Sequence, residues 1–99
     1  MTRIDPTVVI ERMASGLRSA GADHPVAGAV ALAARGHVRL EQQEFAATVG
    51  CSVEHIRSTE IGDVAFGDLP AHLGDAALVL GVDLLALADL EQAWQAETR

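Results

Sequence analysis

Two side chains that could do chemistry lie four residues apart in the middle of the chain. Cys51 and His55 stand in the stretch "QQEFAATVGCSVEHIRSTEIG", residues 42–62. A nucleophilic thiolate needs a nearby base and an electropositive setting, and zinc takes four ligands at recognisable spacing. The remaining histidines supply no such spacing. We therefore expect no metal and no cofactor, and we interpret Cys51 as a small turn residue.

Acidic side chains are the other candidates for chemistry. The chain has 14 Asp and Glu among its 99 residues, but no pair stands in a sequence context typical of a glycosidase or protease. The glycines do not form a loop pattern that cradles phosphate. We therefore expect that the protein is not an enzyme. The function of the stretch 42–62 then depends on the helices that it forms.

This stretch predicts two short helices joined by a tight turn. Apolar residues at helical spacing give the first helix, over 42–49, an inward face. Gly50 suits the left-handed conformation that closes a helix. Ser52 is a favourable N-cap for a second helix over 53–61, and Gly62 ends it.

The rest of the chain predicts further helices and an all-α, compact domain of five to six helices. Asp5 is expected to cap a first helix, Asp68 a later one and Asp83 the last. The stretch "VAGAVALAARGHV", residues 26–38, is apolar nearly all round, which is typical of a helix buried on several sides. Apolar residues make up 49% of the chain, and its many Ala and Leu residues favour helices over strands.

Four motifs carry a resemblance to a known family. L-x-Q-x-x-F-A begins at Leu40, V-G-x-S at Val49, and I-x-x-x-E-x-G at Ile56; L-x-x-A-A-x-x-L-G-V-D follows from Leu73. Over about residues 26–90 the chain thereby resembles the Xre/Cro/lambda-repressor-type helix-turn-helix family. The resemblance implies a lambda-repressor-like helix-turn-helix fold.

The resemblance also implies how the chain is organised. Residues 1–24 would form an extra N-terminal helix and a short linker, and residues 25–99 the helix-turn-helix domain with a C-terminal helix. In many members an Arg on the helix before the motif pairs with a Glu near the end of the recognition helix, which here implies Arg35 and Glu60. Removing one partner of such a buried pair costs about 3–5 kcal/mol.

By the same resemblance, the second helix of the motif is a recognition helix that lies in the major groove. A glutamate can accept a hydrogen bond from cytosine N4, and a valine can contact a thymine methyl group. The resemblance assigns these residues to DNA binding: Gln42, Gln43, Ser52, Val53, Glu54, His55, Arg57 and Ser58.

The last helix is expected to form a dimer interface. In the family the final helix often builds a two-fold dimer, and Trp is favoured at interface centres. We expect a homodimer in which Leu84, Leu87, Leu90 and Trp94 meet the partner. Leu84 and Leu87 could equally belong to the core of the protomer.

The charge of the chain opposes DNA binding. The formal net charge is −7, and all seven cationic residues are Arg. From Asp63 onward, seven acidic residues are opposed only by Arg99. Phosphate contacts supply most of the non-specific affinity for DNA, and Arg39 and Arg57 are few for that purpose.

Two functions remain. We expect a small transcriptional regulator that binds double-stranded DNA with the helix over 53–61. The alternative is a protein-interaction module of helix-turn-helix fold, antitoxin-like or an accessory subunit, with weak or no DNA binding. A single cysteine fits a reducing compartment, and the chain shows no signal peptide and no membrane-spanning apolar run. We therefore expect a cytoplasmic protein without a membrane partner.

Overall fold

The computed structural model describes residues 5–97, and over this range it consists of helices joined by turns and loops, without strands. This confirms the all-α fold of five to six helices that the sequence predicts. The helices are α1 (Pro6–Ser19), α2 (Pro25–Val38), α3 (Gln42–Val49), α4 (Val53–Glu60), the 3-10 helix η1 (Phe66–Asp68), α5 (Ala71–Val79) and α6 (Leu84–Glu97).

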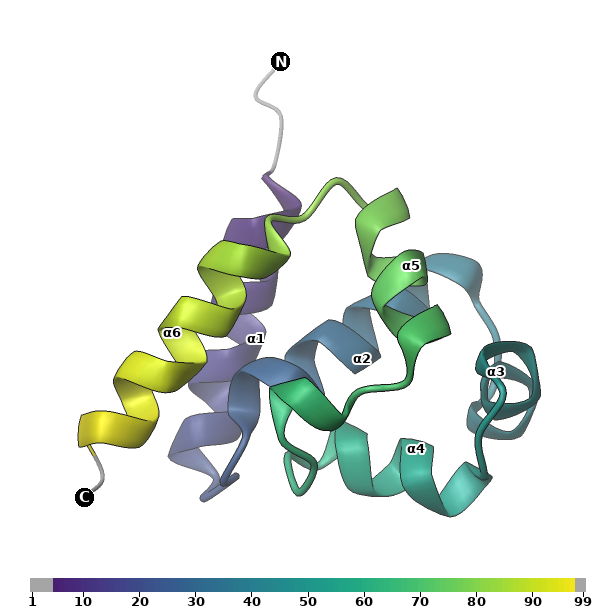
Figure 1. Cartoon of the computed structure of the whole chain (residues 1–99), viewed down its shortest axis with the longest axis horizontal. Coiled ribbons are helices and arrows are strands. Elements are labelled where there is room, and N and C mark those ends of the chain that lie inside the picture. The colour runs from purple at the N-terminus through teal and green to yellow at the C-terminus, as the bar shows by residue number, and fades with distance from the viewer. Residues whose placement is uncertain (1–4, 98–99) are drawn as a thin grey trace.

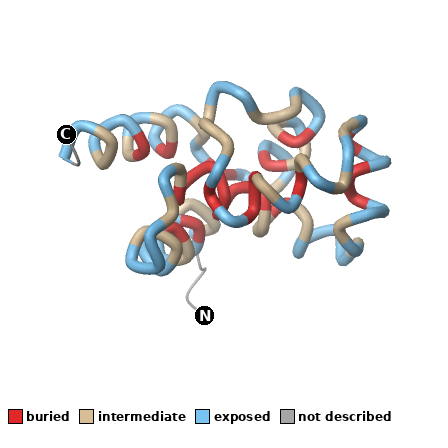
Figure 2. The backbone as a smooth tube through the Cα atoms, turned by 90° about the horizontal axis from the view of Figure 1, so that it is seen from below, coloured by how far each residue is buried: buried red, intermediate tan, exposed pale blue. Residues whose placement is uncertain are grey.

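Helix α2 lies at the centre of the molecule. It contacts α1, α4, α5 and α6, and eight of its 14 residues are buried. Helices α1 and α6 lie on one side of it and α3, α4 and α5 on the other (Figure 1). The buried part of the backbone is accordingly concentrated in the middle of the molecule (Figure 2). Small residues on α2 allow its neighbours to approach closely. A Cβ on Gly28, for example, would lie only 3.0 Å from the carbonyl oxygen of Thr59.

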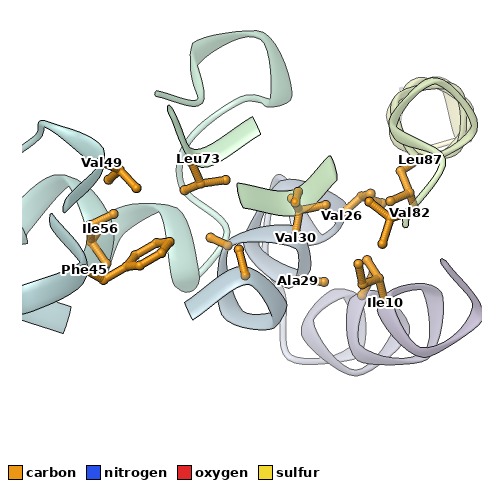
Figure 3. Packing of buried hydrophobic residues seen from close by; sticks show 14 of the residues in the cluster. Ile10, Val26, Ala29, Val30, Phe45, Val49, Ile56, Leu73, Val82 and Leu87 are labelled. Carbon is orange, nitrogen blue, oxygen red and sulfur yellow. The ribbon is translucent and has the colours of Figure 1, made fainter. Parts of the chain in front are cut away.

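The hydrophobic core extends along both sides of α2 (Figure 3). Removing these side chains from water is the main force that holds the helices together. On the side of α3, α4 and α5 the core residues include Phe45, Val49, Ile56 and Leu73. On the side of α1 and α6 they include Ile10, Ala14, Val82 and Leu87.

Short-range signals begin and end several helices as predicted. The carboxylate of Asp5 accepts the backbone N–H of Thr7 at 2.9 Å. The side chains of Ser52 and Asp83 each accept the backbone N–H three residues further on. Gly50 closes α3 with φ +78°, in the left-handed region. These four predictions are confirmed.

The predicted cap of the helix after residue 68 is wrong. Asp68 ends η1, and α5 begins only at Ala71, with no side-chain cap. A residue before proline is disfavoured in the helical conformation. Leu69 accordingly stays extended, with ψ 141°, and the helix starts after Pro70.

Helix α2 takes its N-terminal cap from α6, a contact over 64 residues of sequence. His24 occupies the N-cap position but makes no side-chain capping hydrogen bond. Instead Oε2 of Glu91 accepts the backbone N–H of Ala27 at 2.8 Å. Burial raises the pKa of Glu91, although the Ala27 N–H and the neighbouring His24 oppose that shift. A buried carboxylate therefore joins α6 to the start of α2.

The chain leaves α4 through a glycine that lies against the connection between α1 and α2. Gly62 has φ +87°, and a Cβ there would lie 2.5 Å from Cβ of Ala22. Its carbonyl oxygen accepts the backbone N–H of His24 at 2.7 Å. This position therefore needs glycine both for its conformation and for the close approach.

Gly62→Ala and Gly81→Ala should separate these two effects. Gly81 also has a positive φ, +79°, but a Cβ there would meet open space. The left-handed conformation costs an alanine about 1–2 kcal/mol, and the steric clash at Gly62 should add about 1–3 kcal/mol. Urea unfolding followed by Trp94 fluorescence measures both losses. Equal losses would show that the approach to Ala22 is not tight.

Glu91→Gln should change how stability depends on pH. The variant keeps an acceptor for the Ala27 N–H but cannot ionise. Because burial raises the folded-state pKa of Glu91 above its ordinary value of 4.5, the unfolded chain gives up this proton at lower pH than the folded protein. The free energy of unfolding of the wild type should therefore fall, relative to the variant, as pH rises from about 4.5 through the folded-state pKa.

Urea unfolding midpoints from acid to neutral pH measure this difference. It should stay constant below about pH 3.5, where the side chain is almost fully protonated in both states. Glu11→Gln, at an exposed position of α1, is the control and should show no such trend. Parallel pH profiles for the wild type and Glu91→Gln would contradict the assignment.

Candidate nucleic-acid interface

Helices α3 and α4, with the turn between them, form a corner at one end of the molecule (Figure 1). The backbone N–H of Cys51 donates to the carbonyl oxygen of Ala46 at 3.0 Å and closes the turn. Phe45 on α3 and Ile56 on α4 are 1% and 0% exposed, so each helix has one face in the core. The opposite face of α4 is left to solvent.

The ion pair implied by the resemblance is present between α2 and α4. Arg35 donates from Nε to Oε2 of Glu60 at 2.6 Å and from Nη2 to Oε1 at 3.1 Å. A third hydrogen bond runs from Nη1 to the carbonyl oxygen of Leu40 at 3.1 Å. The Glu60 side chain is 5% exposed, and its hydrogen bond is the main cause that raises the pKa of Arg35. The pair therefore holds α4 to the end of α2 in one orientation.

Gln42 extends this pair into a network that reaches the surface. Its Nε2 donates to Oε1 of Glu60 at 2.9 Å, and its Oε1 accepts Nε–H of Arg57 at 3.4 Å. Both ends of the Gln42 amide are thus engaged within the protein. The side chain positions Arg57 on the exposed face of α4, a role that the sequence did not indicate.

All eight residues that the sequence assigns to DNA binding lie on α3, α4 or the turn between them. Val53 packs against the core, and Ser52 caps α4 with its hydroxyl oxygen. The exposed members are Gln43, Ser52, Glu54 and Arg57, and the half-buried members are Gln42, Val53, His55 and Ser58.

The charges around this corner are mixed. Glu41 and Glu44 are exposed at the start of α3, and Glu54 is exposed in the first turn of α4. Against them stand two exposed arginines, Arg57 and Arg39. Arg39 ends α2 with φ +55°, and it is the one residue other than glycine with positive φ among residues 5–97. The electrostatics of the corner therefore offer few contacts for phosphate.

The predicted dimer interface on α6 needs a correction. Leu87 is 0% exposed and lies in the core beside Val82 (Figure 3), so it is not available to a partner. Trp94 packs against its own protomer: the guanidinium carbon of Arg18 lies 4.6 Å from the ring centroid. Leu84 and Leu90 are half-buried against the same core. The exposed leucine of α6 is instead Leu85, at 80%.

The cysteine of the turn is a free thiol and is half-buried. Burial raises the pKa of Cys51, which disfavours the thiolate that nucleophilic chemistry requires. Among residues 5–97, no group of three or more His, Cys, Asp or Glu side chains is placed to hold a metal ion. Over the same range, none of the helices combines the length and the apolar character needed to cross a membrane.

Comparisons of the chain with protein-family models, with curated proteins and with solved structures give no match.

Arg35→Met should destabilise the protein by about 3 kcal/mol, because it leaves the buried Glu60 carboxylate without its cation. Adding Glu60→Leu should recover most of that loss, since no charge then remains to be compensated. Urea unfolding measures both variants.

Arg12→Met is the matched control, because Arg12 is exposed on α1. It should change the free energy of unfolding by less than about 0.5 kcal/mol. If Arg35→Met and Arg12→Met gave the same small loss, the pair would not be holding α4 to α2.

Proposed function

We propose that this protein is a small regulator that binds double-stranded DNA as a homodimer and reads it with the exposed face of α4. One observation carries the proposal. The network of Arg35, Glu60 and Gln42 fixes the corner of α3 and α4, with Arg57 at its exposed end. Such a rigid, polar helix at a protruding corner suits the major groove, which admits one α-helix.

The exposed face of α4 has side chains that are chemically able to read bases. Glu54, in the first turn, can accept a hydrogen bond from cytosine N4. Ser58, one turn further along, can donate or accept. With Arg39 and Arg57 as the exposed cations near the corner, phosphate contacts are few, and affinity for unrelated sequences should be low. Binding then depends on base contacts more than in a basic protein.

Leu85 is the proposed centre of the homodimer contact, with the half-buried Leu84 and Leu90 on the same helix. Its side chain is 80% exposed, and large apolar side chains on a surface mark contacts with other chains when they gather in a patch. In a two-fold dimer the two copies of α4 would each read one half of a palindromic site.

Glu54→Ala should change the preferred DNA sequence. Purified protein is incubated with a pool of randomised duplexes, and the retained duplexes are sequenced. The wild type should enrich a palindromic motif. The variant should lose its preference at the positions that Glu54 contacts, because each lost base contact reduces discrimination by about 1–3 kcal/mol. Glu11→Ala removes the same charge from an exposed position of α1 and should leave the motif unchanged.

An unchanged motif with Glu54→Ala would exclude Glu54 from the reading face. No enrichment by the wild type would favour a second function, a protein-interaction module. The observation for that function is the exposure of large apolar side chains on two helices: Leu78 is 58% and Val79 76% exposed on α5, and Leu85 is 80% exposed on α6. They lie in the part of the chain from Asp63 onward, which has seven acidic residues.

A further inference from the structure

A cleft of about 630 Å³ lies between α6 and the segment that joins α4 to α5. Its apolar wall includes Phe66 from η1 and Ala88 from α6, and its polar wall includes His24, Glu91 and Gln92. The volume falls within the range of about 300–1,000 Å³ that is usual for small-molecule sites. None of its lining residues in the described range is an arginine.

One oxygen of the Glu91 carboxylate has no hydrogen-bond partner in this cleft. Oε2 accepts the backbone N–H of Ala27, but Oε1 is buried and unpaired. The nearest cationic candidate, Nδ1 of His24, lies 3.8 Å away, which is too far for a hydrogen bond. The whole side chain is 5% exposed, so the carboxylate is largely withdrawn from solvent.

The capping of α2 compensates this charge only in part, through the Ala27 N–H and the helix dipole. A neutral glutamine could also accept the Ala27 N–H, whereas a buried carboxylate loses its hydration and needs a compensating cation. A group that supplied both a positive charge and a donor at Oε1 would remove that cost. To reach Oε1, such a group has to displace the His24 imidazole, whose side chain is 27% exposed and whose Nδ1 lies 3.4 Å from Nε2 of Gln95.

We infer that this cleft binds a small organic cation: an ammonium or amidinium group that donates to Oε1 of Glu91, attached to an apolar body that lies against Phe66 and Ala88. An anionic ligand is disfavoured, because the carboxylate of Glu91 lines the cleft and no arginine among the described lining residues offsets its negative charge. The site is separate from the exposed face of α4, and its test involves no DNA.

The test compares three probes that share one body and differ in head group: 2-phenylethylamine, 2-phenylethanol and phenylacetate. Each is titrated to millimolar concentration at neutral pH into the isotope-labelled protein, and the backbone amide signals are followed by two-dimensional NMR. The amine should shift signals of residues 65–67 and 88–92. The alcohol and the carboxylate should bind at least about tenfold more weakly, since they lack the charge-assisted hydrogen bond.

Two variants connect the binding to Glu91. Glu91→Gln should weaken the amine by about tenfold or more, because it removes the charge but keeps the cap on α2. Asp89→Asn makes the same charge change at an exposed position of α6 outside the cleft, and its affinity should match that of the wild type. The NMR spectrum itself reports whether each variant is folded.

Ala96→Phe supplies a second route if Glu91→Gln fails to fold. Ala96 is exposed and lines the cleft, so a phenyl ring there should occupy the site without disturbing the core and should abolish binding of the amine. Three results would overturn the inference: no shifts around the cleft with the amine, equal affinity for amine and alcohol, or undiminished binding of the amine by a folded Glu91→Gln or Ala96→Phe protein.

Discussion

The orientation of α4 depends on one ion pair, whose carboxylate is buried. The Glu60 carboxylate is almost fully removed from water, and Arg35 compensates it with two hydrogen bonds. A third hydrogen bond from Arg35 holds the segment between α2 and α3 at Leu40. A charge in such a place costs least when its partner is fixed in geometry. The pair therefore acts as a strict constraint. Any shift of α4 along α2 would separate the two side chains, and Gln42 adds α3 to the same constraint.

A second polar contact holds the other end of α2. Glu91 lies at its N-terminus, and Arg35 lies in its last turn. This arrangement matches the helix dipole, which favours negative charge at the N-terminus and positive charge at the C-terminus. Between these contacts α2 is packed by small apolar residues. The central helix is thus held by polar contacts at its ends and by hydrophobic packing along its length, with α6 and α4 attached to opposite ends.

These structural demands leave few cations for binding DNA. Arg35 is engaged by Glu60, and Arg18 lies over Trp94 and pairs with Glu97 at 2.5 Å. The corner of α3 and α4 retains Arg39 and Arg57 beside three exposed glutamates. A DNA-binding protein with such a surface would rely on the shape and the base contacts of one rigid helix. The residues that line the cleft beside α6 likewise include no arginine within the described range.

The sequence by itself determined the helices and many of their ends. Capping by Asp5 and Ser52 and the left-handed Gly50 act over a few residues, so their effects follow from local chemistry; the failure at Asp68 came from a 3-10 turn before a proline. Only the tertiary structure decided that Leu87 is buried within the protomer, that Gln42 turns inward and that Glu91 caps a helix 64 residues away. Packing between distant segments sets burial and charge compensation, and no local pattern encodes which face a neighbouring helix will cover.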